Sequence, residues 1–187
     1  MPFDFEPQEI QEVILIRPRV FEDERGFFME TYRKADFEAA GMSGEFVQNN
    51  HSRSHYKVLR GLHFQREPYA QAKLVRCVHG EIFDVAVDLR KDSPTFGKYV
   101  SVNLSEENKY QLYIPGYCAH GFVVLSEFAD VIYNVDRVYA PEYESGLLWN
   151  DADINVEWPI KKPIVSQKDR NLLFLKELIE KDDIFRG

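Results

Sequence analysis

The middle of the chain is a series of short runs in which apolar and polar residues alternate, and this pattern most constrains the fold. In residues 81–89 (EIFDVAVDL), one face carries four apolar side chains, while the other carries Asp84 and Asp88 together with Ile82 and Ala86. Further strand-like runs and their turns are found between Glu45 and Val138: strands at 73–78, 98–104, 110–114, 121–125 and 129–136, and turns at His79-Gly80, Ser93-Pro94 and Pro115-Gly116. Many short strands without alternating helices indicate an all-β sandwich or small barrel.

The two ends of the chain add a few other elements. Residues 13–20 (VILIRPRV) predict a strand, and residues 33–41 (RKADFEAAG) predict a short helix that ends at Gly41. Near the C-terminus, residues 166–169 (SQKD) form a potential capping box for a helical segment at about 166–182. The face of that segment would carry Leu172, Leu175, Leu178 and Ile179. No linker or repeat divides the sequence, so we expect one domain over residues 1–187.

Composition excludes several classes of protein. The 187 residues carry a formal net charge of −8, which argues against nucleic acid as the main partner. The apolar runs are too short to span a bilayer, and the N-terminal MPFDFEPQEI has no signal-peptide pattern, so a cytoplasmic protein without membrane partners is expected. The two cysteines, Cys77 and Cys118, lie in apolar strand-like surroundings and are predicted to be buried, reduced thiols.

Polar residues in the strand-like segments point to a binding site. Inward side chains of a small barrel pack its core, and the mouth can hold one small ligand, so polar residues on an inward face need a reason. The candidates are Arg60, His63, Gln65, Lys73, His120 and Tyr133.

Histidines in such a barrel suggest a metal site. Metal-binding cupins usually supply two histidines one residue apart, but here His63-Phe64-Gln65 supplies one imidazole. His120 is the other candidate ligand, which gives two histidines, whereas zinc or iron usually has three protein ligands. We therefore predict no metal.

Five motifs in order then resemble a known family. They are RGLHFQ at 60–65, QAKLVR at 71–76, SPTFG at 93–97, IP…AHGF at 114–122 and SQKD at 166–169. Together they resemble the dTDP-4-dehydrorhamnose 3,5-epimerases over about residues 10–170. The resemblance implies a mainly β, cupin-type jelly-roll barrel with short N- and C-terminal helices. One departure is Ala72, where the family often has glycine.

The chemistry of that family explains the residue types. Its members invert carbons 3 and 5 of dTDP-4-dehydro-6-deoxy-D-glucose, and both carbons flank the ketone at carbon 4. Such a reaction needs a base on one face of the sugar, an acid on the other, and a donor or cation at the ketone oxygen. No cofactor is required.

By resemblance, His63 is the base, Asp169 orients its imidazole, and Tyr133 is the acid on the opposite face. Lys73 and His120 are the candidates for the ketone and enolate oxygen.

The resemblance also implies the contacts to the nucleotide and a homodimeric form. Arg25 and Arg60 match the pyrophosphate contacts, and a guanidinium suits phosphate oxygens. Tyr139 matches the aromatic that stacks on thymine. Arg25 and Glu30 are expected to serve the site of a neighbouring subunit. The remaining matches to ligand-contacting positions are Gln48, Asn50, Glu144 and Lys168.

Two alternatives remain open from the sequence. One is a relative with a different outcome on the same nucleotide sugar, either a single-site 3- or 5-epimerase or a 3,4-ketoisomerase, which product stereochemistry would distinguish. The other is a non-catalytic sugar-nucleotide-binding or metal cupin, which would bind without turnover or contain stoichiometric metal.

Overall fold

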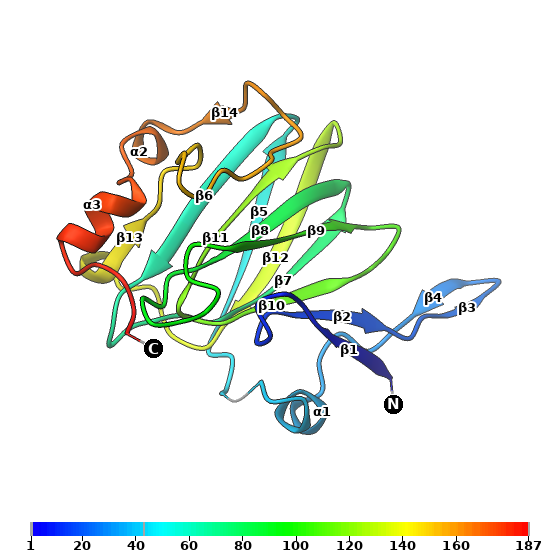
Figure 1. The fold of residues 1–187 in the computed structure, drawn as a ribbon. Coiled ribbons are helices and arrows are strands. Elements are labelled where there is room, and N and C mark those ends of the chain that lie inside the picture. Colours follow the sequence, from blue (N-terminus) through cyan, green and yellow to red (C-terminus); the bar gives the residue numbers. More distant parts are fainter. Residues whose placement is uncertain (1, 43, 187) are drawn as a thin grey trace.

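Two antiparallel sheets face each other in the computed structural model, which describes residues 2–42 and 44–186 (Figure 1). Sheet 1 contains, in spatial order, β1 (Phe3–Pro7), β2 (Ile14–Pro18), β10 (Gln111–Ile114), β7 (Lys73–His79), β12 (Phe128–Val135) and β5 (Gln48–His55). Sheet 2 contains β13 (Glu144–Gly146), β6 (Val58–Gln65), β11 (Cys118–Val124), β8 (Glu81–Asp88) and β9 (Tyr99–Ser105), and β14 (Ile164–Val165) runs parallel to β6. The predicted mainly β, cupin-like class is confirmed, but within the described residues the two sheets do not close into one hydrogen-bonded ring.

Smaller elements lie outside the sheets. A hairpin of β3 (Phe21–Asp23) and β4 (Gly26–Phe28) projects away from the body (Figure 1). The predicted N-terminal helix is confirmed as α1 (Lys34–Ala39), and Gly41 follows it with a φ of +87°, which favours glycine. The 3₁₀ helix η1 (Pro141–Tyr143) precedes β13. None of the helices in the described ranges is long and apolar enough to cross a membrane.

The C-terminal segment differs from its predicted helical face. Ser166 does cap a helix, because its Oγ accepts a hydrogen bond from the Asp169 amide at 3.0 Å. That helix, α2 (Gln167–Arg170), is separate from α3 (Leu175–Glu180), because Leu173 forms a β-bridge with Leu147 between them. As a result, α3 is short and buries Leu175 and Leu178. The placement of Leu172 on a helix face was wrong, because it lies between α2 and α3. Ile179 does lie in α3, but its side chain is exposed.

Strand β11 begins earlier than the predicted 121–125. Cys118, Ala119 and His120 pair with residues 86–88 of β8, so they continue the sheet instead of the preceding turn. His120 therefore projects from a strand, and its side chain is buried.

The space between the sheets is apolar over much of its extent. Its buried side chains come from both sheets and include Val75, Cys77, Ile82, Ala86, Leu104, Leu112, Ile114, Cys118, Val124 and Val131. Separate apolar clusters cover the outer faces, where α1 packs on sheet 1 and α3 packs on sheet 2. Cys77 and Cys118 are free and buried as predicted, and burial raises the pKa of Cys77 to about 12.

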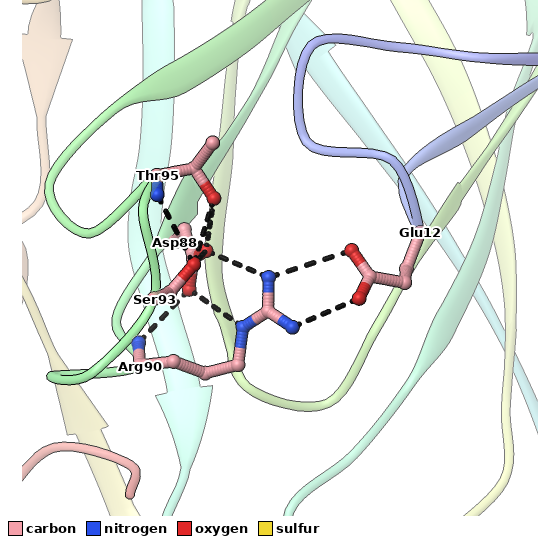
Figure 2. Close-up of polar contacts among 5 residues, drawn as sticks. All are labelled: Glu12, Asp88, Arg90, Ser93 and Thr95. Atoms are coloured by element: carbon pink, nitrogen blue, oxygen red, sulfur yellow. Dashed lines mark hydrogen bonds and ion pairs between the residues drawn. The ribbon is translucent and has the colours of Figure 1, made fainter. Parts of the chain in front are cut away.

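Asp88 shows how a carboxylate can be accommodated on a buried face (Figure 2). Oδ2 accepts hydrogen bonds from Arg90 Nη2 at 2.8 Å, Ser93 Oγ at 2.8 Å and Thr95 Oγ1 at 2.6 Å. Arg90 also donates to Glu12 at 2.9 Å, which ties the N-terminal turn to the loop after β8. Burial alone would raise the pKa of Asp88, but these hydrogen bonds hold it below its ordinary value.

A β-bulge in β6 positions the polar residues of the pocket. Residues on a regular strand alternate between faces, so Arg60 and His63 would point to opposite sides. In the pairing of β6 with β11, however, His63 lies opposite His120 and Arg60 lies opposite Phe122, with a shift in register between them. Two residues of β6 therefore oppose one residue of β11, and both Arg60 and His63 line the same pocket.

Two glycines permit this bulge. Gly61 has a φ of +118°, and a Cβ on it would lie 2.6 Å from the Gly121 Cα. A Cβ on Gly121 would lie 2.6 Å from the Arg60 carbonyl oxygen. The two backbones approach too closely for any side chain, so glycine is needed on both strands.

The first prediction tests this contact. Gly121→Ala should push β6 and β11 apart, lowering the free energy of unfolding by about 1–3 kcal/mol. It should also reduce turnover about 10²-fold, because Arg60 and His63 move together relative to the pocket. Urea unfolding and steady-state kinetics measure the two effects.

Gly97→Ala is the matched control. Gly97 has a φ of +72°, and a Cβ on it would lie at ordinary contact distances of 3.7 and 3.8 Å from the Ile154 and Leu175 side chains. Alanine should therefore strain the turn and destabilise the chain by about 1–2 kcal/mol without changing turnover. Equal turnover in Gly121→Ala and the wild type would show that the glycine contact does not position the pocket.

Candidate active site

A polar pocket opens between the two sheets, and all six polar candidates from the strand-like segments line it. Its walls come from β5, β6, β7, β11, β12 and the start of β13, together with the loops that carry Gln71 and Tyr139. The lining residues are Ser52, Arg60, His63, Phe64, Gln65, Gln71, Lys73, His120, Gly121, Phe122, Tyr133, Tyr139 and Glu144.

His63 and Asp169 form a hydrogen-bonded pair. His63 Nε2 lies 2.7 Å from Asp169 Oδ1, and the backbone amide of Gly61 donates to Asp169 Oδ2 at 3.3 Å. Burial would raise the pKa of Asp169, but the hydrogen bond to His63 holds it below its ordinary value. An ionised carboxylate accepts only, so Nε2 carries the hydrogen and Nδ1 is left with a lone pair. This tautomer suits a base.

The predicted capping box is only half formed. Ser166 caps the Asp169 amide, but the Asp169 carboxylate binds His63 and Gly61 in place of the Ser166 backbone. The helix cap thus sets the position of the side chain that orients the imidazole.

Lys73 is a buried cation next to this pair. Its Nζ donates to the His63 carbonyl oxygen at 3.1 Å. Burial lowers the pKa of Lys73 to about 8, and the negative charge of Asp84 is the largest opposing influence. The ammonium still predominates at neutral pH, so the pocket holds a positive charge with little water around it.

His120 lies directly across the β6–β11 ladder from His63. Its Nε2 is 2.8 Å from Asp84 Oδ1. Burial lowers the pKa of His120, although Asp84 opposes this effect. The site therefore contains two histidine–carboxylate pairs side by side.

Tyr133 comes from the opposite sheet. It lies on β12 of sheet 1, whereas His63 lies on β6 of sheet 2, and both line the pocket. Burial raises the pKa of Tyr133, so its phenol keeps the proton at neutral pH. A proton acceptor and a proton donor thus stand on facing walls.

The rim of the pocket is built around Tyr139, whose side chain is half exposed. Its hydroxyl donates to Glu144 Oε2 at 2.5 Å, and Lys168 Nζ pairs with Glu144 Oε1 at 2.6 Å. The Tyr139 amide donates to Gln48 Oε1 at 3.1 Å, while Gln65 Oε1 accepts from the next amide, that of Ala140, at 2.7 Å. These bonds hold the aromatic ring at the entrance.

Two more of the predicted ligand-contacting residues, Arg60 and Asn50, lie at or next to the pocket. Arg60 Nε donates to Ser54 Oγ at 2.8 Å, which holds its guanidinium over the pocket wall. Asn50 lies opposite Tyr133 on β5 and accepts a hydrogen bond from Gln48 Nε2 at 2.9 Å.

Arg25 and Glu30 are not brought to this pocket within one chain. Arg25 sits on the projecting β3–β4 hairpin, where its side chain is 85% exposed and pairs with its neighbour Asp23. Glu30 follows the hairpin and lies 3.9 Å from Arg33. Neither residue lines the pocket, and their expected role in the site of a neighbouring subunit stays a prediction.

Several residues of the site were not predicted as site residues. Ser52, Gln71 and Phe122 line the pocket. Gln71 and Phe122 lie within the motifs at 71–76 and 114–122, whereas nothing in the local sequence distinguishes Ser52. Asp84 lies behind His120. Its sequence context could have identified it, because it is a charged residue on the strand face that also carries Ile82 and Ala86.

Metal binding is not decided by the structure. Among residues 2–42 and 44–186, no group of three or more His, Cys, Asp and Glu side chains is arranged to hold a metal ion. The prediction of no metal stays a prediction, and elemental analysis of purified protein would test it.

Comparison with known proteins gives one family. The sequence profile described as dTDP-4-dehydrorhamnose 3,5-epimerase matches residues 7–177. A Shigella flexneri protein with the same description is 59% identical over 87% of this chain and 91% of its own length.

Two solved structures are close in fold. The crystal structure of dTDP-6-deoxy-D-glucose-3,5-epimerase from Legionella pneumophila, in complex with dTDP-4-keto-L-rhamnose, superposes with a TM-score of 0.94 at 42% identity, covering 99% of this chain and 98% of that one. A 3′-monoepimerase from Streptomyces bikiniensis, in complex with dTDP-quinovose, has a TM-score of 0.90 at 31% identity, covering 96% and 92%.

The second prediction follows from the burial of Lys73. Lys73→Met removes a charge that is desolvated in the folded state, so it should raise the free energy of unfolding at pH 7 by about 1–3 kcal/mol while abolishing activity. Urea unfolding as a function of pH measures this gain.

The sign of the pH dependence provides an internal control. Because the folded pKa of Lys73 is lowered to about 8, the wild type loses stability as pH falls from about 10 towards 8 and stays at that lower level below it. The advantage of Lys73→Met should therefore shrink as pH rises from 8 to 10. A constant difference across this range would mean that Lys73 is not a desolvated cation.

Proposed function

This chain belongs to the dTDP-4-dehydrorhamnose 3,5-epimerase family, and we propose that it inverts carbons 3 and 5 of dTDP-4-dehydro-6-deoxy-D-glucose to give dTDP-4-dehydro-L-rhamnose. The observation that carries this proposal is the placement of the His63–Asp169 pair and the Tyr133 phenol on facing walls of one pocket. Inversion at carbon requires this opposition, because the proton must leave from one face and return to the other.

The first step is removal of a proton next to the ketone. The free Nδ1 of His63 takes the proton from carbon 3 or carbon 5, and the C–H electron pair moves into an enolate. Asp169 stays ionised and stabilises the imidazolium that forms, while fixing the orientation of the ring.

The enolate is stabilised by a cation. Lys73 presents a buried ammonium to the pocket, and such a charge acts strongly on a developing oxyanion because little water screens it. The ammonium is already in place before the reaction, so no reorganisation is needed when the negative charge forms.

The second step returns a proton from the opposite face. Tyr133 donates its phenolic proton to the carbon, which leaves a tyrosinate that regains a proton from solvent at the pocket mouth. His63 releases its proton to solvent in the same way. The cycle then repeats at the other carbon that flanks the ketone, so neither step changes the oxidation state of the substrate.

The nucleotide portion of the substrate would lie towards the rim. Arg60 can bind a pyrophosphate oxygen, and the half-exposed ring of Tyr139 can stack on a flat base. Gln48, Asn50, Glu144 and Lys168 surround that ring through the hydrogen bonds described above.

We further propose a homodimer in which each subunit completes the site of the other. The β3–β4 hairpin projects from the body (Figure 1). It exposes Phe21, Phe27 and Phe28 to solvent and also carries Arg25. Aromatic side chains on a projecting hairpin are costly to leave in water, and a second copy of the chain would bury them. Arg25 and Glu30 would then reach the partner's pocket.

A cytoplasmic location suits this activity, because a charged nucleotide sugar does not cross a bilayer unaided.

A single-site epimerase is the alternative. The same fold serves a 3′-monoepimerase among the structural neighbours, so the architecture alone permits inversion at one carbon. NMR of the product formed in deuterated water distinguishes the two: deuterium at carbons 3 and 5 with an L-configured product supports the double epimerase, and deuterium at one carbon supports the alternative. No deuterium at either carbon would contradict the proposed function.

The third prediction separates base from acid. His63→Ala should reduce deuterium exchange at both carbons by about 10²–10⁴-fold while dTDP binding is retained, because the base and the nucleotide contacts are separate groups. Tyr133→Phe should retain measurable exchange but lose net inversion, since proton removal survives and the opposite donor is gone. Loss of dTDP binding in His63→Ala would make His63 structural, and full epimerisation by Tyr133→Phe would remove Tyr133 from the mechanism.

The fourth prediction tests the shared site. Arg25→Ala and His63→Ala should each be nearly inactive alone, but co-expressed chains that pair at random should regain about one quarter of wild-type activity, because half of the dimers contain one intact site.

Co-expression of His63→Ala with Lys73→Met is the matched control. Both changes damage the pocket of their own chain, so every site in a mixed dimer carries a defect and no activity should return. Equal activity in the two mixtures would contradict the exchange of Arg25 between subunits.

A further inference from the structure

Asp84 is a fully buried carboxylate that the mechanism above does not use. It lies on β8 between Ile82 and Ala86, and none of its surface is exposed. Its Oδ1 accepts a hydrogen bond from His120 Nε2 at 2.8 Å, whereas Oδ2 is buried and has no hydrogen-bond partner among the described residues. Asp84 does not line the pocket itself, so it can act there only through His120 and through its charge.

Comparison with Asp88 on the same strand face shows what is unusual about Asp84. Both carboxylates are fully buried, but Asp88 is saturated by Arg90, Ser93 and Thr95 (Figure 2). A carboxylate that only supports the fold is expected to look like Asp88, because an unpaired buried oxygen is unfavourable. Among residues 2–42 and 44–186, Asp84 Oδ2 has no partner, and the one side-chain hydrogen bond of Asp84 goes to a residue of the pocket.

That hydrogen bond determines what His120 can offer to a ligand. An ionised carboxylate has no hydrogen to donate, so Nε2 of His120 must carry one. Nδ1 forms no hydrogen bond with the described part of the chain and is not among its fully buried unpaired atoms. The free nitrogen therefore keeps access to the pocket that His120 lines.

The charge of His120 follows from its surroundings. Burial lowers its pKa, Asp84 opposes this, and the positive charge of Lys73 lowers it further. A protonated His120 would add a second cation beside Lys73 in a small desolvated space. The neutral ring, with a lone pair on Nδ1, is the form that the geometry supports.

We propose that Asp84 is a positioning residue that holds His120 as the Nε2–H tautomer, so that His120 Nδ1 accepts a hydrogen bond from a hydroxyl of the bound sugar or from the enol. This inference rests on the proposed function and gives the two residues different roles near the ketone. Lys73 supplies the positive charge, and His120 supplies a hydrogen-bond acceptor. His120 cannot then be the donor to the ketone oxygen.

The first measurement is made on the wild-type protein alone. Long-range ¹H–¹⁵N correlation spectra of histidine-labelled protein at neutral pH distinguish the two neutral tautomers and the imidazolium, and the signals that vanish in His120→Gln identify His120. We expect hydrogen on Nε2 only. Hydrogen on Nδ1, or on both nitrogens, would overturn the proposal whether or not any Asp84 variant folds.

The second measurement uses Asp84→Asn. An amide can either accept from Nε2 or donate to it, so the tautomer should become mixed or reversed, and turnover should fall about 10–100-fold. The KM for the nucleotide sugar should change by less than about three-fold, because the nucleotide contacts lie elsewhere.

Asp88→Asn is the matched control, since it alters an equally buried carboxylate on the same strand. It should lower stability while leaving the His120 spectrum and turnover unchanged. If Asp84→Asn keeps the wild-type tautomer and turnover, or loses only as much turnover as Asp88→Asn, Asp84 is structural and the proposal fails. If the wild type shows the expected tautomer but puts no deuterium into the sugar, the proposed function fails and the pairing of Asp84 with His120 stands.

Discussion

The backbone contact between Gly61 and Gly121 is the constraint on which the pocket depends. It allows β6 to bulge, and the bulge turns Arg60 and His63 towards the same interior. The same bulge leaves the Gly61 amide free of the ladder, where the Asp169 carboxylate accepts its hydrogen bond. One irregularity in one strand therefore sets the position of a phosphate-binding candidate, the base and the group that orients the base, although Asp169 comes from the far end of the sequence.

The interior between the sheets has two parts with different physical requirements. The larger part is held together by burial of apolar side chains, and the buried carboxylate of Asp88 beside it is saturated by hydrogen bonds. The pocket part gathers Lys73, His120 and Asp84 with fewer bonds than their burial would demand. Such groups are tolerated where a ligand completes them, which is a common reason for local departures from the rules of a stable core.

The sequence predicted the strands well because their alternation reflects which face is buried, and this is a local property. It also identified the polar residues that gather in the pocket, since charged residues in strand-like runs are conspicuous. It could not predict the shared orientation of Arg60 and His63 from period two, because the bulge depends on a contact with a distant glycine. Leu172 falls outside a helix for a similar reason: the β-bridge of Leu173 to Leu147, which separates α2 from α3, is a long-range contact. The proposed role of Arg25 in a partner's pocket rests on the family resemblance, because a contact between two subunits leaves no pattern in the periodicity of one chain.

The two buried thiols have a practical consequence for studying assembly. Cys77 and Cys118 are shielded by the core, and burial raises the pKa of both, so neither offers a thiolate to alkylating reagents in the folded protein. The native cysteines of the folded chain should therefore not react with thiol-labelling reagents. A cysteine introduced on the β3–β4 hairpin would react alone, and a fluorophore attached there would report directly on how the hairpin meets its surroundings.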